Sequence, residues 1–315
     1  MKNRKIIIGF IIAFFCLLLI ETFIYLTYSN TQKDEVKIAF IVTGDNLDEW
    51  ESMKAGAETA ALDKDVSVDF VNVPVDLGNE GEQEAVLRAF NDGADYAVVA
   101  TSDYPAMISF INERQLFNKV FLARNCALNA TINGVVADDE AIATDFSRYI
   151  SFNYNCKNIL IVSSHEDINV DTLKESLIEN LDSKGIKAEY RLMSSDPSVI
   201  KKSLYNIEIL GNYDGIITLD YYTMEGAASG KLRINRDIKV FSVDNSQEAV
   251  YYLDSQGINA LAFKDDYSMG FLAVLQITDK KEYGNMASNA PLYYIADREN
   301  MYSDELEKVL FPFVK

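Results

Sequence analysis

Polar residues follow most of the apolar, strand-like segments of this chain, and they are the groups that could do chemistry. The segments that end in them include Val36–Thr43, Tyr96–Ala100 and Gly215–Leu219. Carboxylates, amides and the Arg and Lys side chains can hold a polar ligand by hydrogen bonds. Two neighbouring carboxylates could instead act as the acid and base of a glycosidase. The candidate residues at these strand ends are Asp45, Asn46, Asp103, Arg124, Asp220, Asp244 and Lys264.

Sequence signatures of cofactor, metal and nucleophile chemistry are missing from these strand ends. No GxGxxG or GxxxxGKS/T loop follows a strand, so the backbone cradles that hold dinucleotides and nucleoside phosphates are not expected. Neither a GxSxG turn nor an HExxH helix occurs. The three cysteines form no CxxC pair, and His165 is the single histidine. We therefore expect no metal site and no cofactor.

Alternating strands and helices must position the candidate residues. Short apolar runs predict buried strands, and apolar residues at helical spacing between them predict helices. The predicted strands are 36–43, 66–73, 96–100, 120–123, 159–163, 188–193, 215–219, 238–243 and 259–263. The predicted helices are 48–63, 80–91, 105–117, 140–153, 169–183, 197–208, 222–230, 246–255 and 266–278. This alternation implies an α/β fold of right-handed βαβ units in two Rossmann-like lobes with parallel sheets. Ligands of such sheets bind beyond the carboxyl ends of the strands.

The N-terminal segment 6–28 is apolar over 23 residues apart from Glu21 and a few hydroxyl groups. As a helix it is long enough to cross a bilayer core of roughly 30 Å. Basic residues in 1–5 precede it, so this N-terminus is expected in the cytoplasm and the rest of the chain outside the cell membrane. The segment ends in Tyr-Leu-Thr-Tyr and not in a small-residue cleavage site. An uncleaved, single-pass anchor is therefore favoured, with a cleaved signal peptide as the alternative.

Acidic residues dominate the remainder of the chain. The whole sequence has 29 Lys and Arg against 48 Asp and Glu, and residues 34–315 alone carry a net charge of −22. A surface this negative repels phosphate backbones, which excludes nucleic acid as a partner. It also disfavours peripheral binding to anionic lipid.

The segment KIAFIVTGDNLDEWESMKAGAETAA resembles the opening of the type I periplasmic sugar-binding proteins, the ribose- and galactose-binding group. Later segments recur in the order of that family: GADYAVVATSD, VFLAR, GVVADD, ILIVSS, YDGIITLDYYTMEGA, KVFSVDNS, ALAFKDDYSMGFLAV and PLYYIADRENM. Each motif is weak alone, but their order covers about residues 36–300. The resemblance implies two lobes joined by a three-crossover hinge that close on a small ligand.

The same resemblance assigns roles to individual residues. Trp50 matches an aromatic residue that stacks on a sugar ring, although the core-facing start of a helix would also explain it. Arg124 matches a strand-end arginine that binds ligand oxygens through its fork. Asp244 matches an aspartate that accepts bonds from two sugar hydroxyls, and Asp220 stands where the family has Asn or Asp. Asp45, Asn46 and Asp103 are expected at loop tips that face the cleft.

The chain departs from the family pattern at three places. Ala123 replaces the acidic residue that usually precedes the strand-end arginine, and Lys264 stands where an amide or Asp is common. The loop HEDINVDTLKES lacks the family's second ligand-binding arginine. Arg124 and Lys264 would therefore lie among several carboxylates, which leaves a sugar, a sugar derivative or another small polar metabolite open as the ligand. His165, beside this loop, is expected to be exposed to solvent.

The resemblance also divides the chain. We expect a cytoplasmic N-terminus at 1–5, the anchor at 6–28, a linker at 29–35 and two interleaved lobes. The first lobe takes 36–138 plus 265–292, and the second lobe takes 139–264 plus 293–315. Cys126 and Cys156 then belong to different lobes, which favours free thiols over a disulfide between them.

These observations predict a membrane-tethered extracytoplasmic solute-binding protein and not an enzyme. Asp220 and Asp244 are better explained as hydrogen-bond acceptors than as a glycosidase pair, and a DNA-binding repressor of this fold would need a helix-turn-helix and a basic face. Because the anchor has no lipidation context, signalling to a sensor histidine kinase in the same membrane is favoured. The alternative is the substrate-binding component of an ABC sugar importer, which delivers the ligand to a permease.

Overall fold

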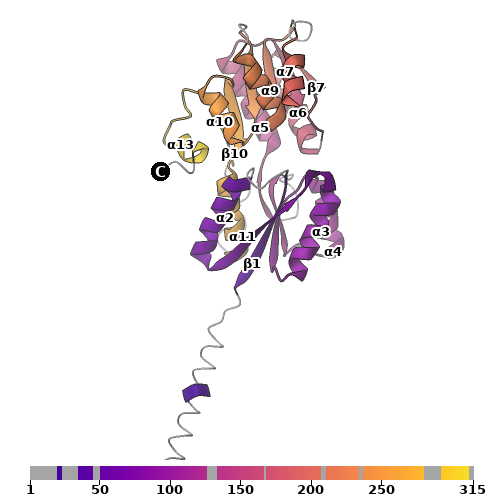
Figure 1. Cartoon of the computed structure of the whole chain (residues 1–315), viewed down its shortest axis with the longest axis vertical. Coiled ribbons are helices and arrows are strands. Elements are labelled where there is room, and N and C mark those ends of the chain that lie inside the picture. The colour runs from indigo at the N-terminus through magenta and orange to yellow at the C-terminus, as the bar shows by residue number, and fades with distance from the viewer. Residues whose placement is uncertain are drawn as a thin grey trace, which may run out of the picture.

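Two sheets organise the chain into two lobes that lie one above the other (Figure 1). The computed structural model describes residues 20–22, 35–44, 50–125, 133–166, 168–206, 211–233, 237–279 and 292–311. Among these residues, no helix combines the length and the apolar character needed to cross a bilayer. The predicted span 6–28 lies outside the described residues except at 20–22, so the anchor stays a prediction.

Lobe 1 is built on a five-stranded parallel sheet in the order β2-β1-β3-β4-β5. Its strands are β1 (Val36–Thr43), β2 (Val66–Val73), β3 (Tyr96–Ala100), β4 (Val120–Asn125) and β5 (Gly134–Ala137). Helices α2 (Glu51–Lys64) and α11 (Asp266–Thr278) lie on one side of this sheet, and α3 (Gly78–Asn91) and α4 (Tyr104–Arg114) lie on the other (Figure 1). A short 3-10 turn, η2 (Val75–Leu77), precedes α3.

Lobe 2 is built on a six-stranded sheet in the order β11-β10-β9-β8-β6-β7. Its strands are β6 (Asn158–Ser163), β7 (Lys187–Leu192), β8 (Gly215–Thr218), β9 (Lys239–Val243), β10 (Ala260–Lys264) and β11 (Tyr293–Ala296). Its helices are α5 (Asp139–Asn153), α6 (Ile168–Ser183), α7 (Pro197–Leu204), α9 (Tyr221–Lys231), α10 (Gln247–Asp254) and α13 (Leu306–Leu310). Helices α5 and α6 pack together, as do α7, α9 and α10.

Alternate residues of the central strands enter different hydrophobic clusters. In β1, Phe40 packs with α2 and α11, whereas the neighbouring Ile41 packs with α3 and α4. In β6, Ile161 and Leu160 divide in the same way between the two faces of the second sheet. Successive side chains of a strand point to opposite faces, so a strand buried on both faces must be apolar throughout. This is why the strands appear in the sequence as continuous apolar runs.

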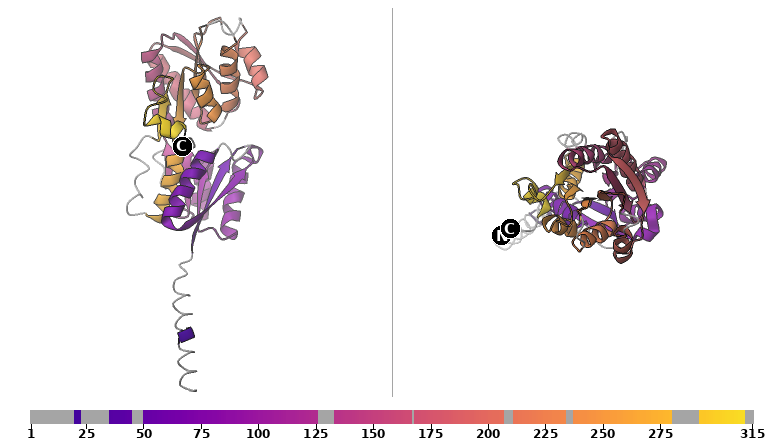
Figure 2. Two further views of the ribbon diagram at one scale, coloured as in Figure 1. Left: turned by 60° about the vertical axis from the view of Figure 1, so that its left-hand side comes forward. Right: turned by 90° about the horizontal axis from the view of Figure 1, so that it is seen from above.

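The chain passes between the lobes at the junction, first from β5 to α5 and then from β10 to α11. After α11 it returns to lobe 2 as β11, and Figure 2 shows the two sheets on either side of these connections. The structure confirms two lobes built from βαβ units, with one correction. The edge strand β11 pairs antiparallel with β10, so the second sheet is not wholly parallel.

Several element bounds differ from the prediction for local reasons. The helix predicted at 105–117 ends at Arg114, because Gln115 takes a left-handed conformation with φ 58° and caps the helix. The helix predicted at 48–63 corresponds to α2 at Glu51–Lys64, and its predicted first residues 48–49 lie outside the described residues. Strands β5 and β11, the helix α13 and the turn η2 were not predicted, since each spans only three to five residues.

Two glycines allow α2 and α11 to cross at close range. A Cβ atom on Gly56 would lie 2.0 Å from the carbonyl oxygen of Tyr267, and one on Gly270 would lie 2.0 Å from the carbonyl oxygen of Met53. The contact is thus reciprocal and made by backbone atoms on both sides. It fixes α11 to lobe 1 immediately after the chain has crossed from lobe 2.

Candidate functional site

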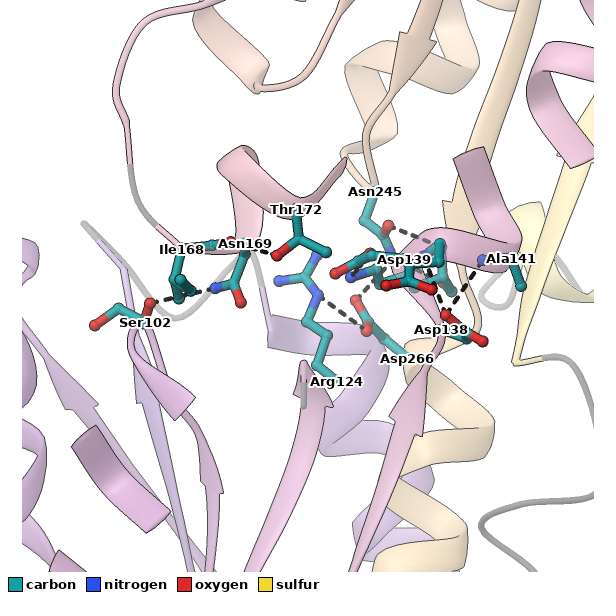
Figure 3. A network of polar contacts seen from close by, with 12 residues as sticks. Ser102, Arg124, Asp138, Asp139, Ala141, Ile168, Asn169, Thr172, Asn245 and Asp266 are labelled. Atoms are coloured by element: carbon teal, nitrogen blue, oxygen red, sulfur yellow. Dashed lines mark hydrogen bonds and ion pairs between the residues drawn. The ribbon is translucent and has the colours of Figure 1, made fainter. Parts of the chain in front are cut away.

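The carboxyl ends of both sheets meet at the lobe junction. The amide of Asn169 in α6 donates to the carbonyl oxygen of Ser102 after β3 at 3.3 Å, which is a direct contact between the lobes (Figure 3). Arg124 of lobe 1 lies close enough to Asp244 of lobe 2 to influence its ionisation. Residues that follow strand ends of both lobes therefore lie near one another at the junction, and their role in binding stays a prediction.

Arg124 is held in an unusual backbone conformation at the end of β4. Its φ angle of 69° is in the left-handed region, which L-residues with side chains rarely adopt. Its guanidinium lies 4.6 Å from the ring centre of Trp50. Its Nε lies 3.4 Å from Oδ1 of Asp266, whose side chain is 3% exposed (Figure 3). The arginine is therefore fixed between an aromatic face and a buried carboxylate.

Trp50 lies directly before α2 and is buried in the core of lobe 1, with 5% of its surface exposed. Arg124 covers one face of its ring. A sugar therefore cannot stack on that face while Arg124 lies there. Its indole N–H finds no hydrogen-bond acceptor among the described residues. A buried donor without a partner carries a desolvation cost, which a ligand oxygen would remove.

Lys264 ends β10 and forms an ion pair with Asp139 at the start of α5, with 2.7 Å between Nζ and Oδ1. Both side chains are nearly buried. Asn245 reinforces this region, because its amide donates to the Lys264 carbonyl at 2.7 Å and to Asp266 Oδ2 at 2.8 Å. In return it accepts from the Lys264 backbone N–H at 3.0 Å. Lys264 is thus part of the connection between the lobes as well as of the junction.

Asp244 follows β9 and is buried. Burial raises the pKa of its carboxyl to about 6, and the nearby Asp220 adds to this effect. The Ser246 N–H, which donates to Oδ1 at 2.6 Å, and the positive charge of Arg124 act in the opposite direction. Desolvation of the charged form therefore dominates the behaviour of this group.

Asp220 is the N-cap of α9 and accepts from the Thr223 backbone N–H at 3.0 Å. It also accepts from the backbone N–H and the hydroxyl of Ser164, at 2.6 and 3.0 Å. Its carboxylate therefore joins the loop after β6 to the start of α9. The neighbouring His165 is exposed, as the sequence analysis expected.

The remaining candidates of lobe 1 have different outcomes. Asp103 is the N-cap of α4, where its Oδ1 accepts from the Ala106 N–H at 3.0 Å, and it directly follows the interlobe contact of Ser102. Asp45 and Asn46 lie outside the described residues. No group of three or more potential metal ligands occurs in the part of the chain that the structure describes.

Glu82 of α3 is a feature that the sequence analysis missed. The side chain is fully buried, and its carboxylate accepts from the hydroxyls of Thr43, Thr101 and Ser102 at 2.7, 2.5 and 2.8 Å. It also accepts from the Ser102 backbone N–H at 2.9 Å. These bonds hold together the carboxyl ends of β1 and β3, and they fix the residue that contacts Asn169 of lobe 2.

The substitution Glu82→Gln should lower the free energy of unfolding by about 2 kcal/mol. The amide replaces one acceptor with a donor, and hydrogen bonds to a charged group are worth about 1.5–3 kcal/mol each. Urea unfolding of this variant beside Glu84→Gln would measure the effect, since Glu84 is exposed on the same helix and forms a surface ion pair with Arg88. Equal stability of the two variants would contradict the role given to Glu82.

Comparison with solved structures places the fold among known ones. A carbohydrate transporter solute-binding protein from Agrobacterium radiobacter, in complex with D-arabinose, matches with a TM-score of 0.73 and 14% identity, covering 88% of this chain and 99% of that chain. A carbohydrate transporter from Acidothermus cellulolyticus, in complex with myo-inositol, matches with a TM-score of 0.70 and 16% identity, covering 84% and 95%. A periplasmic ribose ABC transporter from Conexibacter woesei matches with a TM-score of 0.68 and 14% identity, covering 87% and 97%.

These similarities define the fold as that of the type I periplasmic binding proteins, as the sequence predicted. No protein-family model matches the chain, and no curated protein matches it. The similar structures are solute-binding proteins of sugar transporters. At 14–16% identity, the similarity to this chain is one of fold.

Proposed function

We propose that the protein is a solute-binding protein that captures a sugar or sugar derivative between its lobes and delivers it to an ABC permease. The observation that carries this proposal is the place of Arg124 in lobe 1 and of Asp220 and Asp244 in lobe 2, at the carboxyl ends of strands that meet at the lobe junction. Ligands of parallel α/β sheets bind at this position. Similar structures that span most of this chain hold D-arabinose and myo-inositol.

We prefer delivery to an importer as the function. The sequence alone favours signalling to a sensor kinase instead. The similar structures are described as transporter proteins, and the comparisons give the kinase partner no support. Deletion of the gene would separate the two roles. Loss of uptake of the bound sugar with an unchanged transcriptional response supports the importer, and the opposite result supports the sensor.

The proposal includes the anchor at 6–28, with the lobes outside the cell membrane. Its basis is the length and apolar character of that segment and the basic residues before it. Protease treatment of intact cells would digest the lobes if they lie outside. Detergent, but not high salt, would release the chain from the membrane fraction.

A binding assay tests the capture of sugars directly. Titration calorimetry of the full chain with D-arabinose, D-fucose, myo-inositol and amino sugars should give at least one ligand. Asp220→Asn should then weaken binding of that ligand by about tenfold or more, because it removes the charge from one acceptor. Asp214→Asn is the matched control, since Asp214 accepts backbone N–H bonds from Lys157 and Asn158 at the start of β6. Equal affinity of the two variants would contradict the site.

A further inference from the structure

The charges at the lobe junction are not balanced. Among the described residues, Arg124 and Lys264 each already have a carboxylate partner, because Arg124 pairs with Asp266 and Lys264 pairs with Asp139. These pairs account for the charges of Arg124 and Lys264. The remaining carboxylates include Asp220 and Asp244, which both lie in lobe 2.

Asp220 and Asp244 accept hydrogen bonds from uncharged groups, although carboxylates at such a position usually pair with a cation. Asp220 accepts from Ser164 and Thr223, and Asp244 accepts from Ser246. Among the described residues, no Lys, Arg or His nitrogen lies within 4.0 Å of either carboxylate. The two groups also repel each other, as the effect of Asp220 on the pKa of Asp244 shows. Asp244, which is the buried one of the two, therefore lacks the close cation that buried charges require.

We propose that the ligand supplies this missing charge and is a sugar or polyol that carries an ammonium group. The inference rests on the proposed function and specifies the class of its ligand. An ammonium group has three donors and no acceptor, so it complements two carboxylates in both charge and hydrogen bonding. The ligand hydroxyls remain available as acceptors, and the buried N–H of Trp50, beside Arg124, is one donor without a partner among the described residues.

Other ligand charges fit the junction less well. An acidic sugar would have to take Arg124 from Asp266 or Lys264 from Asp139, and breaking a buried ion pair is costly. A neutral sugar can donate to Asp220 and Asp244, but it leaves both carboxylates without a counter-ion, and Asp244 is buried. The ammonium group is the one that lowers this electrostatic cost.

Matched sugars that differ in one substituent test the inference. Calorimetry of the full chain at pH 7.5 would compare D-glucosamine with D-glucose and N-acetyl-D-glucosamine, and D-galactosamine with D-galactose and N-acetyl-D-galactosamine. We expect the amine to bind at least about tenfold more tightly than its two counterparts in at least one series. Asp244→Asn should remove this preference, whereas Glu84→Gln, on an exposed helix face, should retain it.

The outcomes separate the inference from the proposed function. If neutral sugars or inositol bind as tightly as the amines or more tightly, the inference is wrong and the proposed function stands. If the amine preference survives Asp244→Asn, the charge does not act through this carboxylate and the inference is also wrong. If no sugar, polyol or amino sugar binds, the proposed function fails and the inference fails with it.

Discussion

Replacing Asp244 by Asn should stabilise the ligand-free protein at pH 7.5 by about 3 kcal/mol. The folded-state pKa of this carboxyl is about 6, whereas an unfolded chain gives Asp a pKa near 3.9. The folded protein therefore binds this proton more tightly than the unfolded chain, and the ionised carboxylate destabilises the fold. A difference of about two pKa units corresponds to about 3 kcal/mol. Asn removes the charge and keeps an oxygen that can accept from Ser246.

The sign of this effect sets its pH dependence. The destabilisation is fully present above pH 6, decreases as the pH falls from 6 towards 4, and is absent below both pKa values. Urea unfolding at pH 7.5 and pH 4 should therefore show a large gain for Asp244→Asn at the higher pH and little at the lower. Asp63→Asn, at an exposed position of α2, is the control and should change little at either pH. A variant no more stable than the wild type at pH 7.5 would contradict the prediction. It would show that the charge of Asp244 does not destabilise the folded protein.

The same substitution should weaken binding of the amine ligand to the affinity of its neutral counterparts, even as it raises stability. Asp244 would then be a residue that lowers the stability of the ligand-free protein but is needed for tight binding, as is common at functional sites. Calorimetry with any ligand of the wild type checks this. Retained affinity in a stabilised variant would separate Asp244 from the binding site.

Substituting Ala for Gly56 or Gly270 should destabilise lobe 1 by about 3 kcal/mol or more. In most helices this change is favourable by about 1 kcal/mol. Here the added methyl group would lie 2.0 Å from a backbone oxygen of the opposite helix, so α2 and α11 would have to move apart. Overpacking in a well-packed core costs about 1–3 kcal/mol, and more when the obstacle is backbone.

The glycine variants should also weaken ligand binding, because α11 begins at Asp266, which holds Arg124. Thermal unfolding and calorimetry would measure both effects. Glu58→Ala on the exposed face of α2 is the control and should lower stability by little, since its pair with Lys54 is exposed. Full stability in either glycine variant would contradict the close crossing of the two helices.

Continuous apolar runs made most of the fold predictable. Strand β1 and helix α11 have the bounds that the sequence predicted, since burial on both faces or one long apolar stripe leaves a clear pattern. Strand β11 was missed because four residues show little periodicity and nothing local marks an antiparallel pair. Its place in the sheet depends on contacts with β10, about thirty residues earlier in the chain.

The place of the candidate residues in the fold was predictable, but their pairing was not. Arg124, Asp220 and Asp244 could be placed at strand ends because parallel strands gather their carboxyl ends at one edge. The partner of Arg124 could not be predicted, since Asp266 reaches it only after the chain has crossed lobe 2 and returned. Glu82 could not be distinguished from the exposed acidic residues beside it in α3, because only the packed structure shows which of them faces the strand ends.

The ion pair between Lys264 and Asp139 has a mechanical consequence. The two residues belong to different connections between the lobes, one after β10 and one after β5, and their side chains are nearly buried. Twisting one connection against the other would separate these charges, which is unfavourable for a buried pair. We therefore expect the two connections to rotate together as one hinge. The lobes would then swing preferentially about the line that joins these two connections.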